Sequence, residues 1–167
     1  MDSSLASIDW KTGELQNQWR LADRRLSLRH LARHANGSIA VALQAQHDDV
    51  VERAVAPVLA LFDPATGTLA TVSGSSGLAG YAGDIASIGD QWVVACPRSN
   101  LLVHFSIDGQ RTGQQTLAAA CAVAALEGTA MGWATGHGAV AAVGASTHIT
   151  HLAPALEMDN HAVLLPG

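Results

Sequence analysis

Arg29 and His30 are adjacent residues whose side chains support two different kinds of chemistry. A guanidinium group such as that of Arg29 presents a fixed fork of N–H donors that matches a carboxylate or a phosphate. The imidazole of His30 could ligate a metal ion or exchange a proton near neutral pH. These residues are therefore the first candidates for a ligand site. The alternative is that both side chains bond backbone carbonyls and an acidic neighbour such as Asp84.

The eight histidines of the chain also raise the question of a metal site. His148 and His151 are three residues apart, a spacing that places two side chains on one face of a helix but on opposite faces of a strand. Because the surrounding residues have the pattern of a strand, this pair is a poor chelate. His30, His137 and His161 could share a metal only if three separate segments meet. A scattered set of surface and core histidines is the simpler interpretation, and the sequence assigns neither a metal nor a cofactor.

The motifs of nucleophilic catalysis and nucleotide binding are missing from the sequence. The Ser73–Gly77 segment lacks the Gly-x-Ser-x-Gly pattern of a nucleophile elbow and has the composition of a flexible connector. Gly136-x-Gly138 is too short for a dinucleotide-binding fingerprint. The sequence therefore assigns no catalytic residue and favours a non-enzymatic protein.

Short Asp/Gly turns separate the apolar segments of the chain. A strand-like segment ends at Asp9 and turns at Thr12-Gly13, and the same arrangement recurs in the Asp63–Gly67 segment and, in shorter form, at Asp108-Gly109. These aspartates are best explained as turn residues whose carboxylates accept the following backbone N–H groups. Asn36-Gly37 is a strong hairpin signal, because both residues tolerate positive φ. The chain is thus expected to form successive antiparallel hairpins.

The spacing of the hairpins predicts an all-β fold, a β-propeller fragment. Corresponding strands recur about 40 to 55 residues apart, as in propeller blades. We expect a single propeller-type domain over residues 1–167 with about three and a half four-stranded antiparallel blades. The blades are expected over residues 1–22, 26–72, 82–118 and 121–152, followed by a tail over 153–167. The segment from Gln44 to Pro57 is interpreted as a long loop, and no helix is predicted.

The Leu26–Ala35 segment alternates, and its Leu28–Arg33 part is the candidate innermost strand of its blade, which in a propeller lines the central channel. Its period-2 alternation predicts Arg29 and His30 on opposite faces. Leu28 and Ala32 are expected on the face of His30.

About three and a half blades cannot close a ring, since closed propellers contain about four to eight. An open stack leaves unpaired backbone groups at its first and last strands, which favours pairing with another chain. Three arrangements would satisfy this need. A protein partner could cover the open sheet edges, two copies could complete each other, or the natural protein could contain another half.

Composition argues against several classes of function. The formal net charge is −5, and nucleic-acid binding is not expected because phosphate binding needs a basic surface. Five arginines crowd the stretch from Arg20 to Arg33, and we interpret them as exposed strand and turn positions rather than as a phosphate or carboxylate site. No apolar run reaches about 18 residues, so no transmembrane segment is predicted.

The amino terminus and the cysteines bear on the compartment of the protein. Met1–Ser4 lacks the features of a signal peptide, so the chain as written would be cytoplasmic. Cys96 and Cys121 lie in apolar strand-like segments, where two buried free thiols are expected rather than a disulfide.

An ordered series of short motifs resembles the bacterial family of unknown function DUF1513. In chain order the motifs are Leu26-Ser27-Leu28-Arg29-His30-Leu31-Ala32, Gln44-x-Gln46, Gly80-Tyr81-x-Gly83, Pro97-Arg98, Cys121-x-Val123, Gly136-His137-Gly138 and Asp159-Asn160-His161. The order and spacing agree over most of the chain, roughly from Leu5 onward. The resemblance implies a seven-bladed propeller of the YVTN or quinoprotein-like type, of which this chain matches the C-terminal half.

The resemblance also implies a location and a pathway. Proteins of this family are exported to the bacterial periplasm by a twin-arginine signal, and their genes often neighbour those of imelysin-like, iron-associated proteins. The expected function is a non-enzymatic ligand- or protein-binding module in such an envelope pathway. Together with Asp84, the motifs give the candidate ligand-binding residues Arg29, His30, Gln44, Gln46, Asp84, Arg98, His137 and His161.

The alternative function is a metal- or quinone-dependent oxidoreductase-like propeller with Arg29, His30 and His137 near its site. A stoichiometric metal that is lost in His30→Ala would favour this alternative.

Overall fold

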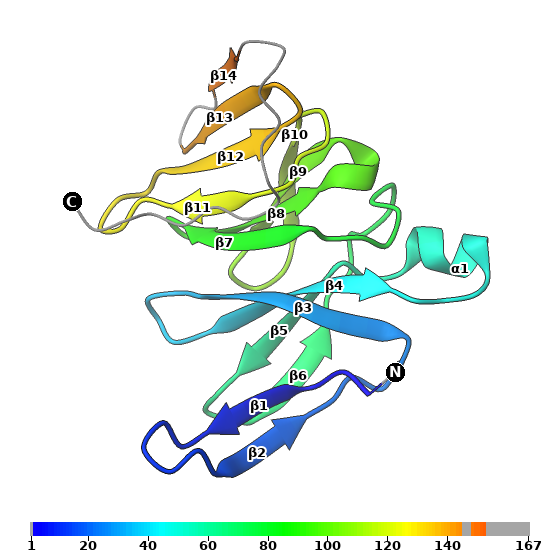
Figure 1. The fold of residues 1–167 in the computed structure, drawn as a ribbon, viewed down its shortest axis with the longest axis vertical. Coiled ribbons are helices and arrows are strands. Elements are labelled where there is room, and N and C mark those ends of the chain that lie inside the picture. The colour runs from blue at the N-terminus through cyan, green and yellow to red at the C-terminus, as the bar shows by residue number, and fades with distance from the viewer. Residues whose placement is uncertain (1, 145–147, 153–167) are drawn as a thin grey trace.

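The computed structural model describes residues 2–144 and 148–152. In this part of the chain the fold is all-β, with four antiparallel sheets and one short α-helix. One sheet has two strands and the other three have four strands each, which confirms the predicted propeller fragment of three and a half blades. The sheets follow one another along the longest axis of the molecule (Figure 1).

Within each sheet, strands that are consecutive in the sequence pair with each other. The first sheet contains β1 (Leu5–Ile8) and β2 (Leu15–Trp19), and the second contains β3 (Leu26–Arg33), β4 (Ile39–Ala45), β5 (Leu59–Asp63) and β6 (Thr68–Thr71). The third sheet contains β7 (Asp84–Ile88), β8 (Gln91–Cys96), β9 (Leu101–Ser106) and β10 (Arg111–Thr116). The fourth contains β11 (Val123–Ala125), β12 (Gly132–Gly136), β13 (Ala139–Val143) and β14 (His148–His151). Outside the sheets lie the helix α1 (Val50–Val55) and the 3-10 turn η1 (Pro97–Ser99).

The Asp9 and Asp63 turns form as predicted, whereas the role predicted for the Asp108 carboxylate stays a prediction. Asp9 accepts hydrogen bonds from the backbone N–H groups of Lys11 and Thr12 at 2.8 and 3.0 Å. Asp63 accepts the N–H of Ala65 and the hydroxyl of Thr66, both at 2.9 Å. These bonds confirm that the two aspartates are turn residues.

Apolar side chains fill the spaces between successive sheets. Between the second and third sheets, small residues such as Ala40 and Ala42 face the large rings of Trp92 and Phe105. A separate cluster joins the third sheet to the fourth. On the other side of the second sheet, Trp19 of β2 lies against Phe62 of β5 with ring centroids 4.5 Å apart. The chain therefore has a separate hydrophobic core between each pair of successive sheets rather than one central core.

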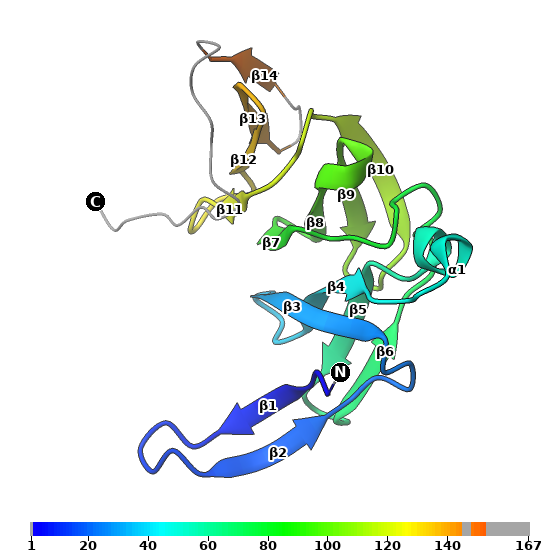
Figure 2. The same cartoon turned by 45° about the vertical axis from the view of Figure 1, so that its right-hand side comes forward.

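The first strand of each four-stranded sheet lies at the inner side of the stack. The strand β7 contacts β3 on one side and β11 on the other. Figure 2 shows these three strands along the same side of the molecule. They occupy the positions that line the channel of a propeller.

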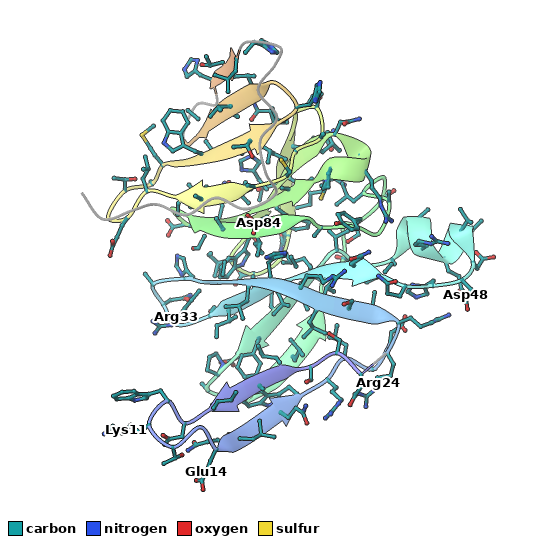
Figure 3. All side chains as sticks on the ribbon, in the orientation of Figure 1. Lys11, Glu14, Arg24, Arg33, Asp48 and Asp84 are labelled. Atoms are coloured by element: carbon teal, nitrogen blue, oxygen red, sulfur yellow. The ribbon has the colours of Figure 1, made fainter. Side chains whose placement is uncertain are left out.

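The connections between strands emerge at two opposite faces of the stack. In the described part of the chain, the hairpins that join the first to the second strand of a sheet, and the third to the fourth, lie at one face, which we call the hairpin face (Figure 1). The links between the second and third strands, and those between sheets, lie at the other, which we call the loop face. Figure 3 shows Arg33 at the hairpin face and Asp48 at the loop face.

The predicted long loop from Gln44 to Pro57 is wrong in two respects. The strand β4 continues to Ala45 and so includes Gln44. Val50–Val55 forms α1, whose N-cap Asp49 accepts the backbone N–H groups at the second and third helical positions. A helix of one and a half turns is too short to show a 3.6-residue period in the sequence, so the aspartate cap was its main local signal.

No helix in the described part of the chain has the length and apolar character needed to cross a bilayer. The predicted tail over 153–167, with His161, lies outside the described residues.

Candidate functional site

A bulge in β3 places Arg29 and His30 on the same side of the sheet. Between Leu28 and Leu31, two residues of β3 face a single residue of β4. Leu28 packs into the cluster on the side of the first sheet, whereas Ala32 packs into the cluster on the side of the third. The predicted common face for Leu28, His30 and Ala32 is therefore wrong, because the bulge interrupts the alternation.

His30 lies opposite Asp84 at the start of β7. The imidazole Nδ1 is 3.8 Å from Oδ1 of Asp84, and the carboxyl side chain is only 11% exposed. The same carboxylate accepts the backbone N–H groups of Ile85 and Val123, each at 2.9 Å. The acidic neighbour expected for His30 is thus present, and it also connects β7 to β11.

The guanidinium of Arg29 bonds an amide rather than the carboxylate of Asp84. Its Nε and Nη2 donate to the side-chain oxygen of Gln44 at 2.9 and 2.5 Å. Gln44 follows Ala42 by two residues on β4, and Ala42 packs against the third sheet, so the side chain of Gln44 is directed to that side too. Arg29 and Gln44 therefore face the loop that enters β7.

Gln44 pairs with Tyr81 of that loop across an isolated antiparallel bridge. Flanking backbone hydrogen bonds of 2.8 and 3.0 Å hold the pair. Such a pair is of the non-hydrogen-bonded type, in which the two Cα atoms approach closely and the side chains lie side by side. The guanidinium of Arg98, in η1, lies over the Tyr81 ring at 4.4 Å from its centroid. Arg29, Gln44, Tyr81 and Arg98 thus form one contiguous set, which we call the two-arginine site.

Sequence reasoning singled out three members of this site and missed Tyr81 as a functional residue. Tyr81 is the one tyrosine of the chain and stands between two glycines, in Gly80-Tyr81-x-Gly83. That isolated aromatic residue was the available signal. Its pairing with Gln44 depends on residues 37 positions apart in the sequence and has no local signature.

Two other predicted residues lie on the loop face without joining the two-arginine site. Gln46 is exposed and uses its backbone N–H to bond the carbonyl of Arg25 at 2.7 Å. His137 is exposed at the turn between β12 and β13, and its backbone N–H bonds the carbonyl of Ala118 at 2.7 Å. The role predicted for these two residues and for His161 stays a prediction.

The arginines divide into ion-paired and unpaired groups. Arg20 and Arg24 pair with Asp2 at 2.7 and 3.6 Å, and Arg25 pairs with Asp23 and Glu52 at 3.2 and 2.9 Å. By contrast, within residues 2–144 and 148–152, neither Arg29 nor Arg98 has a carboxylate within 4.0 Å. The two guanidinium groups of the site are thus not neutralised by the described chain.

A pair between the buried His47 and the half-buried Asp23 holds the loop before α1. The Nε2 of His47 lies 2.9 Å from Oδ2 of Asp23, and the imidazole is 5% exposed. Burial pushes the pKa of Asp23 upward, but hydrogen bonds from the Arg25 backbone and from His47 outweigh it, so the pKa of this carboxyl lies below its usual value. The Nδ1 of His47 is buried and has no hydrogen-bond partner among the described residues. Its burial indicates a structural pair rather than an exposed acid–base site.

The described residues contain no cluster of metal-ligating side chains. In that part of the chain no three His, Cys, Asp or Glu side chains are grouped so that they could hold a metal ion. The metal- or quinone-dependent oxidoreductase alternative with Arg29, His30 and His137 stays a prediction. His161 lies outside the described residues.

The two cysteines differ in burial. Cys96 is buried as predicted, while Cys121 is half-buried. Burial raises the pKa of the Cys96 thiol to about 12.

Comparisons with known proteins agree with the propeller fold. A model of the family described as "Protein of unknown function (DUF1513)" matches residues 1–165. A search of curated proteins finds no match for the chain.

Three solved structures are similar to the chain over most of its length. A streptogramin B lyase is 12% identical, with a TM-score of 0.69, and the match covers 90% of this chain and 48% of the lyase. The selenomethionine-substituted virginiamycin B lyase from Staphylococcus aureus is 11% identical, with a TM-score of 0.69, over 90% of this chain and 49% of the lyase. A catalytically inactive variant of that lyase with quinupristin gives 12% identity and a TM-score of 0.68, over 93% and 50%. At these identities the likeness shows the β-propeller fold alone, and the chain spans about half the length of each lyase.

Proposed function

Because this chain belongs to the DUF1513 family and forms part of a propeller, we propose that it is a non-enzymatic binding module that completes its ring with a second copy of itself. The observation that carries the proposal is the apolar surface left at both ends of the stack. Each inner sheet is covered on both faces by its neighbours, whereas among residues 2–144 and 148–152 the first and fourth sheets have a neighbouring sheet on one face only.

At the first end, β1 and β2 expose a cross-strand apolar pair. Ile8 pairs with Leu15, and these side chains are 60% and 59% exposed. Leu5 pairs with Trp19, which contacts the second sheet, and exposure alternates along β1, so Ile8 is directed away from the second sheet. A cross-strand apolar pair is suited to covering by another sheet.

At the other end, Trp133 of β12 is 42% exposed. Its neighbour Ala134 packs into the cluster shared with the third sheet, so Trp133 is directed away from that sheet. The two ends of one molecule therefore carry different apolar surfaces. Contact between the Ile8 end of one copy and the Trp133 end of the other is head-to-tail, and a two-fold rotation closes it into a ring.

The number of sheets in the described residues is compatible with a dimer as the closed unit. Two copies would contribute six four-stranded sheets and two two-stranded sheets. This total fits a closed ring, for which about four to eight blades are usual.

Sedimentation velocity of the purified chain tests this proposal. We expect a dimer at a protein concentration of about 10 μM. Ile8→Lys and Trp133→Lys should each give a monomer, because a charge at either end disrupts both contacts of the ring. Val51→Lys changes an exposed residue of α1 away from both ends and should leave the dimer intact.

Mixing the two monomeric variants separates head-to-tail contact from other arrangements. In a mixture, the native Trp133 end of the Ile8→Lys variant can contact the native Ile8 end of the Trp133→Lys variant. The two variants should therefore associate with each other. Recovery is not expected if β1 pairs with β1 of another copy, since Trp133 would then be irrelevant. A monomeric native chain at about 100 μM would refute the proposal.

We place the module in the bacterial envelope, in a pathway linked to iron. The support for both statements is the family resemblance described above. Fractionation of cells that express the tagged protein from its own gene tests the location. Recovery of the protein in the cytoplasmic fraction alone would contradict it.

A further inference from the structure

We propose that the two-arginine site binds a small organic dicarboxylate on the loop face of the protein. Arg29 and Arg98 supply the charge, and the Gln44–Tyr81 pair lies between them. The inference does not rest on self-association, because the site lies at the loop face rather than at the Ile8 or Trp133 end.

The charge of the site calls for an anion. The protein as a whole carries a formal charge of −5, and Arg20, Arg24 and Arg25 are matched by nearby carboxylates. Arg29 and Arg98 are held in one site by neutral groups, an amide and an aromatic ring. Two cations fixed in this way attract an anion that brings two negative charges.

Both guanidinium groups keep donors available for a ligand. Arg29 uses Nε and Nη2 on Gln44, which leaves Nη1 outside that contact. Arg98 lies over the Tyr81 ring, and among the described residues its guanidinium group makes no hydrogen bond or ion pair, so its N–H donors are available to a ligand. Because the amide and the ring hold both arginines in place, less side-chain entropy is lost on binding.

The chemistry of the donors favours carboxylates. A guanidinium edge matches a planar carboxylate with two parallel hydrogen bonds, and two separate guanidinium groups match two carboxylates joined by a short linker. The phenol of Tyr81 adds one hydroxyl donor. The carboxylate of Asp84 is nearby in sequence, but it is almost buried and its oxygens accept two backbone N–H groups, so its charge is partly satisfied.

Isothermal titration of the full chain with succinate tests the site. We expect saturable binding at low ionic strength that weakens as salt is added. Arg29→Met and Arg98→Met should each weaken binding at least about tenfold, because each removes one charge-assisted contact. Arg33→Met removes an exposed charge from the same strand at the hairpin face and should leave the affinity unchanged. Circular dichroism of each variant checks that the sheets are retained.

Two further probes decide the ligand class. Succinamide has the same linker without charge and should not bind. Inorganic phosphate should compete weakly. Binding of succinate that is equal in Arg29→Met, Arg98→Met and Arg33→Met would overturn the site, as would absence of succinate binding at about 10 mM. Tighter binding of phosphate than of succinate would overturn the dicarboxylate class.

Discussion

The carboxylate of Asp84, at the start of β7, accepts the backbone N–H of Val123, at the start of β11, over 2.9 Å. These strands belong to different sheets, and the sheets of a propeller are not joined to one another by a backbone ladder. The second oxygen of Asp84 accepts the N–H of Ile85. A residue that the sequence suggested as a ligand contact therefore also fixes the spacing of two inner strands, near the middle of the stack (Figure 3).

Asp84→Asn should lower the free energy of unfolding by about 1–3 kcal/mol, because an amide can replace only one of the two buried acceptor oxygens. Urea denaturation measures the change. Asp90→Asn is the matched control, since Asp90 lies in the turn between β7 and β8 and its side chain is fully exposed. Equal stability of the two variants would show that the link between β7 and β11 carries little energy.

The propeller hairpins could be predicted from the sequence because their signals are local. A glycine after an aspartate or asparagine fixes the turn through its own backbone dihedrals, and Gly13, Gly37 and Gly67 all have positive φ in the structure. The count of strands follows from these turns. Nothing beyond the neighbouring residues is needed to form them.

The candidate site depends on features without a local signal. The residues around the bulge at Arg29 and His30 alternate in polarity as in an ordinary strand. The sequence pattern therefore predicts these two side chains on opposite faces of the sheet. Tyr81 reaches Gln44 only because the loop before β7 lies along the end of β4. Long-range contacts of this kind are set by the packing of two sheets, and single-sequence patterns do not encode them.

Cys96 should be unreactive in the folded protein. Burial raises its pKa to about 12 from an ordinary value of 9.0. In Cys121→Ser, where Cys96 is the remaining thiol, Ellman's reagent at about pH 8 should find no thiol in the native state and one equivalent in denaturant. Rapid stoichiometric labelling without denaturant would contradict the burial of this side chain.

The same pKa difference gives a pH dependence of stability. The unfolded thiol ionises near its ordinary pKa of 9.0, whereas the folded thiol stays protonated until about 12. The stabilisation is therefore fully present below pH 9.0 and is lost as the pH rises through the folded pKa of about 12. When the pH is raised from 9.0 to about 12, the free energy of unfolding should fall less for Cys96→Ala than for the native chain. Denaturation curves recorded across this pH range measure the difference.

The Asp63 turn should respond to acid. Hydrogen bonds from the backbone N–H of Ala65 and from the hydroxyl of Thr66 hold the pKa of the Asp63 carboxyl below its usual 3.8. The turn is stabilised above that value and loses this contribution as the pH falls through the folded pKa. Thr66→Val should raise the titration midpoint of Asp63, measured by carboxyl carbon NMR, while Thr71→Val on β6 should not. An unchanged midpoint in Thr66→Val would show that the hydroxyl does not stabilise the charged form.

Gly80 should be indispensable for the two-arginine site, since it precedes Tyr81 and has no room for a side chain. A Cβ at this position would overlap the carbonyl oxygen of Arg53 and lie 2.9 Å from the Cβ of Ala45. Gly77 has a similar positive φ, 76° against 56°, but open space around it. Both Gly→Ala variants incur the left-handed backbone penalty, of about 1–2 kcal/mol.

Gly80→Ala should lower the free energy of unfolding by about 1–3 kcal/mol more than Gly77→Ala does, because the loop must move away from α1 and β4. That movement separates Tyr81 from Gln44, so succinate binding should weaken in Gly80→Ala and persist in Gly77→Ala. If the two variants are equally stable in urea and bind succinate equally, the close approach of the loop to β4 does not position the site.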